Sequence, residues 1–470
     1  MQVFTEQQKE EINSAALEVL ERVGVEIHSD QALEVLKKGG AYIDGNRARI
    51  PAAMVEKAIR SCPSRVVVGN RDGERVMFLE GNNYYYGAGP TAIYTHDPIT
   101  GERRLPTLAD TARASRVIDA LPNIDYQMDF GTITDVKAGL MDVYTFKAML
   151  ENSVKPIVHW AYNVKNVKAM VEMGVKVRGS LRALQENPLF IIYTEPVTPL
   201  VHEFNALDIS MTLAELEIPS IYTPAPQAGV SAPMTMAGTI VVSICESLSG
   251  LVCHQLVKEG APFIMGGVIT TMDMSTTQIT YGSPEFNILA AGLSEMAHYY
   301  KIPMFSTSGC SDSKCCDAQQ ASEIAHNILM AALSGGNLIH DNGYMESGMA
   351  TSLQAVVLSD ELIGKVKRMM RGIPVDGSTL AVDVIEEVGP GGNFLSEEHT
   401  LENYKDEIWF PELHNRQRYD DWKADGGLTM EERARRKAVD LINNYQPAEL
   451  SSELKQDLND IVAQLEKETK

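Results

Sequence analysis

The feature that most constrains the fold is an alternation of short apolar runs with longer amphipathic stretches between about residues 107 and 340. Runs typical of buried strands occur at 124–130, 156–160, 189–194, 220–223, 263–268, 304–307 and 338–339. Helical patterns fill the gaps at 142–151, 164–178, 204–216, 232–258, 284–300 and 317–333. Strands that alternate with helices form parallel sheets. With an eighth strand from the YYYG run at 84–87 or beyond, the pattern predicts a closed TIM (β/α)8 barrel.

Further elements flank this repeat on both sides. Thr5 and Gln8 form a capping box at the start of a first helix, and short strands at 65–69 and 75–79 precede the barrel. A charged tail with helical patterns follows it. We therefore predict N-terminal helices with a β-hairpin at 1–83, the barrel at 84–350 and a C-terminal helical extension at 351–470.

The net charge and the cysteine content indicate which cellular compartment and which classes of partner suit this chain. The formal net charge of −22 argues against nucleic acid and against anionic membranes as partners. The six cysteines follow no regular disulfide framework, and no signal peptide or membrane-spanning run is recognised. We expect a cytoplasmic protein. The helices of the tail carry Lys/Glu faces that suit solvent or subunit packing, and we expect a homo-oligomer.

The residues that follow the predicted strands are mostly aromatic or polar, with few basic groups. In a barrel the C-terminal ends of the strands meet at the catalytic face. Aromatic faces beside an isolated carboxylate suit a quaternary ammonium, which has no N–H group and is held by cation–π contact. We expect substrate-binding residues among Tyr86, Trp160, Tyr162, Tyr193, Glu195, Tyr222, Gln227, Ser308, Asp312, His340, Asn342 and Tyr344.

A sulfur-rich zinc site is the competing interpretation of this face. Cys310, Cys315 and Cys316 precede His340 on the next predicted strand. Adjacent cysteines do not easily point to one ion, and the C-x4-C spacing falls outside the usual structural zinc patterns. We therefore assign no metal ligands.

Three segments resemble the trimethylamine methyltransferase family, and the resemblance extends over nearly the whole chain. They are SGCSDSKCCDAQQASE at 308–323, HDNGYMESG at 340–348 and GPGGNFLSEEHT at 389–400. The resemblance implies a TIM barrel that demethylates a methylamine and passes the methyl group to the Co(I) centre of a separate corrinoid protein. The cobalamin then belongs to the partner, and this chain binds no cofactor tightly.

Trimethylamine enzymes of that family carry pyrrolysine in the barrel, and this sequence shows none. The chain thus resembles the non-pyrrolysine branch, which implies demethylation of quaternary amines, above all of glycine betaine to dimethylglycine. The nitrogen of such a substrate is already cationic, so a neutral amine leaves without a general acid, and no catalytic residue is assigned. Two alternatives stay open: a zinc-assisted methyltransferase with another methyl donor, and a non-catalytic protein that binds quaternary amines.

Overall fold

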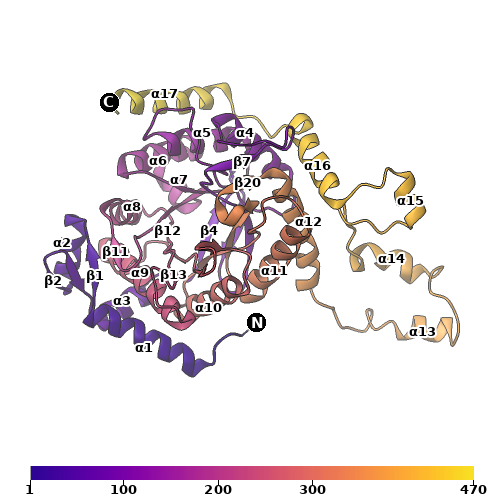
Figure 1. Ribbon diagram of the computed structural model, residues 1–470, viewed down its shortest axis with the longest axis horizontal. Helices are drawn as coiled ribbons and strands as arrows, with labels where there is room; N and C mark the ends of the chain where they lie inside the picture. Colours follow the sequence, from indigo (N-terminus) through magenta and orange to yellow (C-terminus); the bar gives the residue numbers. More distant parts are fainter. Residues whose placement is uncertain (1, 470) are drawn as a thin grey trace.

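A sheet of seven parallel strands forms the centre of the computed structural model, which describes residues 2–469 (Figure 1). Its order is β6-β18-β17-β14-β12-β10-β9, and every neighbouring pair is parallel. The strands are β6 (Tyr85–Ala88), β9 (Ile157–Trp160), β10 (Phe190–Thr194), β12 (Ser220–Tyr222), β14 (Phe263–Gly266), β17 (Met304–Thr307) and β18 (Leu338–Asn342). The strand expected from the YYYG run is β6, which confirms that prediction.

The segment 124–130 closes the sheet into a barrel. Tyr126 forms a parallel bridge with Gly87 of β6, on the edge of β6 that does not pair with β18. Gln127 forms a parallel bridge with Ile157 of β9, the strand at the opposite end of the sheet. This segment completes the eight-membered barrel beside the seven strands of the sheet, although among the described residues it contributes single bridges and no continuous strand. The fold is a TIM (β/α)8 barrel, as predicted.

Helices cover the outside of the barrel because each strand alternates its side chains between lumen and helix layer. Val158, Ile191, Ile221 and Ile264 pack together in the lumen, while Ile192 packs outward. The covering helices are α4 (Leu108–Ala120), α5 (Met141–Asn152), α6 (Val164–Arg178), α8 (Phe204–Glu215), α9 (Met236–Val257), α10 (Pro284–Tyr300), α11 (Ala318–Ser334) and α12 (Leu353–Met370). Helix α12 begins beyond the predicted domain boundary at 350, yet it packs on α11 and α4 as a barrel helix does.

A hairpin plugs the N-terminal end of the barrel. Strands β4 (Val66–Gly69) and β5 (Arg75–Leu79) pair with each other, and their apolar side chains join the luminal cluster. The Gly69 amide donates to the Pro188 carbonyl, just before β10 begins. This end of the barrel is thus filled, and the loops that follow the strands gather at the opposite, C-terminal face.

The N-terminal helices pack against helix α9. They are α1 (Glu6–Arg22), α2 (Asp30–Gly39) and α3 (Ala52–Ser61), and they accompany a small sheet of β11 (Val201–His202), β1 (Val25–Ile27), β3 (Arg47–Arg49) and β2 (Tyr42–Asp44). Contrary to the expectation from sequence, α9 is long and apolar enough to cross a membrane. However, 72% of its most apolar window is buried inside the protein, which is typical of a core helix.

The C-terminal part returns to the barrel after a long excursion. Helix α16 (Met430–Asn444) packs on α12 and α4, and α17 (Ser452–Glu468) packs on α6 and α5. Between α12 and α16, residues 371–427 form an excursion that carries α13 (Val382–Val388), α14 (Glu398–Glu407) and α15 (Tyr419–Ala424) and stands away from the body except where Leu413 joins the core beside α12 and α16 (Figure 1). We call this segment the arm. Many of its large apolar side chains are exposed, among them Ile373, Val375, Leu395 and Leu401.

Candidate active site

A cavity of about 410 Å³ lies at the C-terminal face, next to β9, β10 and α8. Its walls combine aromatic side chains, one carboxylate and several neutral polar groups. They include four predicted site residues: Trp160, Tyr162, Tyr193 and Glu195. The rule that residues after successive parallel strands meet at one mouth therefore holds for β9 and β10.

The aromatic wall is held in place by hydrogen bonds to buried carboxylates. Trp160 Nε1 donates to Asp129 Oδ2 over 2.7 Å. The Tyr162 ring meets the Trp160 ring edge to face, with 4.6 Å between centroids, and the Tyr162 amide donates to Asp142 Oδ2. The Trp160 ring is thus oriented before any ligand arrives, with Tyr162 packed against it, so little conformational entropy of Trp160 is lost on binding.

Glu195 supplies the charge of the cavity. Its side chain faces the open space directly after β10, and its carboxylate makes no hydrogen bond or ion pair with any of the described residues. Glu195 is exposed to solvent on the open side of the cavity. The protein that surrounds its other sides partly desolvates the carboxylate, and the carboxylate of Asp341 adds repulsion, so the pKa of Glu195 rises to about 7. An unpaired carboxylate in such a place would be stabilised by a bound cation.

Two further carboxylates support the site, and neither was predicted as a site residue. Asp129 is buried, which raises its pKa to about 6, and it accepts hydrogen bonds from Trp160 and from the Thr91 amide. Asp341 is buried with a left-handed backbone (φ 74°), and its carboxylate accepts from the Thr307 hydroxyl. Asp341 belongs to the HDNGYMESG segment, so the sequence places a carboxylate near this face. The inward orientation of that carboxylate depends on the left-handed backbone, which the sequence does not reveal.

Three predicted residues lie inside the barrel and do not line this cavity. His340 stacks on Phe305 with 4.0 Å between ring centroids, and its Nδ1 donates to the Ser306 carbonyl oxygen. Asn342 Nδ2 donates to the Gly87 carbonyl, while Asn342 Oδ1 and the Ser308 hydroxyl are buried with no partner among the described residues. Unpaired buried polar atoms are costly, and they leave donors and acceptors free for water or ligand.

Tyr344 explains the glycines of the YYYGAGP run. Its hydroxyl donates to the Pro90 carbonyl, and its ring lies against Gly89, where an added Cβ would stand 2.5 Å from a ring carbon. Gly87 has the same role for the Tyr126 ring. At both glycines the missing side chain lets a tyrosine ring of the protein itself approach the backbone closely.

Four predicted site residues are placed elsewhere. Tyr86 and Tyr222 both face the helix layer: the Tyr86 hydroxyl donates to the Ile328 carbonyl, and the Tyr222 hydroxyl bonds to His202 Nδ1. Predicting them at the mouth was wrong because alternate residues of a strand point to opposite sides. The Asp312 carboxylate accepts from the amides of Tyr281 and Gly282 and fastens loops. Gln227 lies in β13 (Gln227–Ala228), a short strand above the barrel, outside the cavity wall.

Substitution of these two outward tyrosines should affect stability alone. Tyr222→Phe leaves His202 with an unsatisfied buried nitrogen, and we expect it to lower the free energy of unfolding by about 1–3 kcal/mol. Tyr86→Phe should cost about 1 kcal/mol. Denaturant unfolding measures both costs, and calorimetric titration should find ligand affinity unchanged. A loss of affinity in a folded Tyr222→Phe protein would return this residue to the site.

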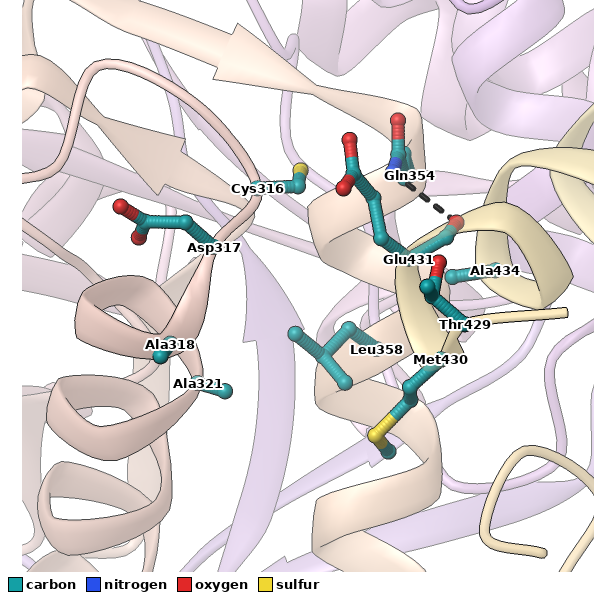
Figure 2. Close-up of a pocket in the computed structure, with 10 residues that line it drawn as sticks. All are labelled: Cys316, Asp317, Ala318, Ala321, Gln354, Leu358, Thr429, Met430, Glu431 and Ala434. Atoms are coloured by element: carbon teal, nitrogen blue, oxygen red, sulfur yellow. Dashed lines mark hydrogen bonds between the residues drawn. The ribbon is translucent and has the colours of Figure 1, made fainter.

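The cysteines do not assemble a metal centre. Cys310 is buried beside Asn327, Cys315 is exposed, and Cys316 lines a different cavity of about 260 Å³ between α11, α12 and α16, with Leu358 and Met430 (Figure 2). Within residues 2–469 no group of three or more His, Cys, Asp or Glu side chains is arranged to hold a metal ion.

Comparison with known proteins gives matches along the whole chain. The profile of the trimethylamine methyltransferase (MTTB) family matches residues 1–470. Trimethylamine methyltransferase MttB of Desulfitobacterium hafniense (strain DSM 10664 / DCB-2) is 32% identical, over 99% of this chain and 94% of that protein. Glycine betaine methyltransferase of Desulfitobacterium hafniense (strain Y51) is 29% identical, over 99% and 97%. Among solved structures, the Methanosarcina barkeri monomethylamine methyltransferase (MtmB) aligns with a TM-score of 0.47 and 12% identity, over 98% and 94%.

Proposed function

The chain belongs to the trimethylamine methyltransferase (MTTB) family, and we propose that it transfers a methyl group from a quaternary amine to the Co(I) centre of a separate corrinoid protein. The observation that carries this proposal is the unpaired carboxylate of Glu195 in a cavity walled by Trp160, Tyr162 and Tyr193. A quaternary ammonium spreads its charge over methyl groups. Aromatic faces and a nearby carboxylate attract it without needing a hydrogen bond.

The chemistry asks for binding and orientation more than for proton transfer. Co(I) attacks one methyl carbon, the C–N bond breaks, and its electron pair stays on nitrogen. A neutral tertiary amine leaves, and the cobalt becomes methyl-Co(III). The task of this chain is to hold the cation, to direct one methyl group towards the open C-terminal face, and to exclude water. Because the hairpin fills the other end, the corrinoid partner would approach at this face.

Glycine betaine is the first substrate to test, since a relative of similar length is named for it. Incubation with the amine and a reduced corrinoid protein should yield one tertiary amine per methyl-Co(III) formed. Trimethylamine, offered in the same assay, should not react. Rapid demethylation of trimethylamine with no reaction of any quaternary amine would overturn the proposal. Binding of quaternary amines without methyl transfer would favour a binding protein instead.

Metal removal should leave the reaction intact. The described cysteines are scattered, and no protein-bound metal is needed when the leaving amine is neutral. We expect less than one zinc per chain by elemental analysis and full activity after dialysis against a chelator. One zinc per chain, with activity lost on its removal and restored on its return, would favour the zinc-assisted alternative.

We also propose that the chain self-associates through the arm with a second copy. Exposed apolar side chains such as Leu395 (82% exposed) and Ile373 (86% exposed) would be covered in such an assembly. Light scattering should give a mass above that of one chain, and Leu395→Glu with Ile373→Glu should reduce it. A monomeric wild-type protein would contradict this part.

A further inference from the structure

The cavity of the candidate active site carries charge of one sign only. Among residues 2–469, its wall contains one ionisable side chain that carries charge near neutral pH, the carboxylate of Glu195, and no Lys, Arg or His. The other polar groups of the wall are neutral: the hydroxyls of Thr91, Thr132 and Thr194, and the amide of Asn205. Behind the wall lie two more carboxylates, those of Asp129 and Asp142, which hold Trp160 and Tyr162 in place.

Arg103 and Arg104, which follow β6 in the chain, already form ion pairs with carboxylates of the protein. Arg103 donates three hydrogen bonds to the Glu346 carboxylate at 2.8–3.0 Å. Arg104 bonds to Asp97 and to Asp110 at 2.7–2.9 Å. These pairs satisfy the guanidinium groups, and neither arginine belongs to the cavity wall.

A betaine would bind weakly in this cavity because it carries a carboxylate close to its nitrogen. That carboxylate would give up water without gaining a cation, and it would lie close to Glu195. The first turn of α8 contributes Asn205 and Ala206 to the wall, but amides at a helix start offer only a partial positive charge. A neutral hydroxyl, by contrast, can pair with Thr or Asn side chains at little cost.

We infer that the substrate is a small quaternary ammonium cation with a neutral polar tail, such as a hydroxyethyl group, and that a betaine binds more weakly. This inference rests on the proposed function and narrows its substrate class. Glu195 is the residue that sets the preference, because it attracts the ammonium and repels a carboxylate.

Choline and glycine betaine form a matched pair for the test, since both carry a trimethylammonium head and differ in hydroxyl against carboxylate. Calorimetric titration of the full-length protein at pH 8 should give an affinity for choline at least tenfold above that for glycine betaine. An equal affinity, or a preference for glycine betaine, overturns the inference while leaving the proposed function standing. Binding of neither compound, with no methyl transfer from either, refutes the proposed function itself.

Glu195→Gln tests the cause of the preference. In this variant the choline affinity should fall and the glycine betaine affinity should hold or rise, so that the ratio approaches one. Circular dichroism checks the fold. If the ratio stays at its wild-type value in a folded Glu195→Gln protein, Glu195 does not set the preference, and the assignment of this residue is wrong.

Discussion

Replacing Glu195 with glutamine should weaken binding of choline about 30-fold. The substitution keeps the shape of the side chain and removes its charge. Two opposite charges about 4 Å apart attract by about 4 kcal/mol near a protein surface, and an open cavity lets water screen about half of that. A loss of about 2 kcal/mol corresponds to about 30-fold in affinity. Calorimetric titration at pH 8, where Glu195 is ionised, measures the effect.

The pH dependence gives this prediction a second readout. The pKa of Glu195 is raised to about 7, so its negative charge develops only as pH rises through that value. Wild-type affinity for the cation should therefore increase from pH 6 to pH 8, and the Glu195→Gln protein should lack this increase. Glu186→Gln, which removes an exposed carboxylate of α7 (Leu181–Glu186), is the control for net charge. Unchanged affinity in Glu195→Gln would remove Glu195 from the site.

Truncation of Trp160 should weaken binding of the cation about tenfold. An aromatic face contributes about 0.5–2 kcal/mol to a bound cation, and about 1.4 kcal/mol is a factor of ten. Trp160→Phe should recover part of the affinity because a ring face remains. Both variants lose the hydrogen bond to Asp129, so the difference between them isolates the ring. Titration of both proteins, with thermal unfolding as the check on folding, gives the comparison.

A purely structural role for Trp160 makes the opposite prediction. The ring is packed edge to face on Tyr162, and its indole N–H satisfies a buried carboxylate. If that is its whole purpose, both variants should unfold at lower temperature while the folded protein binds the cation as before. Equal affinities for wild type and Trp160→Ala would thus exclude a cation–π contact.

Much of the barrel could be predicted because its sequence signal is local and repeated. Buried parallel strands are short apolar runs, and the helices between them have their own periodicity. The segment 124–130 was found by the same rule, although its ladder is limited to single bridges at Tyr126 and Gln127. Strand β6 was harder to assign because YYYG is aromatic and glycine-rich, and its pairing with β18 and with Tyr126 identifies it.

The sequence predicted which face of the barrel carries the candidate site, but not which side chains line the cavity. Trp160 and Glu195 follow strands and do line the cavity, whereas Tyr86 and Tyr222 occupy strand positions of the opposite parity. Moving one residue along a strand turns the side chain from the barrel lumen to the helix layer. Strands buried on both sides are apolar throughout, so their sequence does not show which residues face the lumen. Asp129 acts through a hydrogen bond to Trp160, a contact between two strands that sequence spacing does not reveal.

The most direct test of the proposed reaction follows the methyl group itself. A quaternary amine with trideuterated methyl groups is mixed with the protein and a stoichiometric Co(I) corrinoid protein for a single turnover. Mass spectrometry then measures the label on the corrinoid and on the released amine. We predict one trideuteromethyl group on cobalt for each tertiary amine formed, at a rate that falls with Glu195→Gln. Unlabelled cobalt after complete mixing, or label transferred from trimethylamine instead, would contradict the proposal.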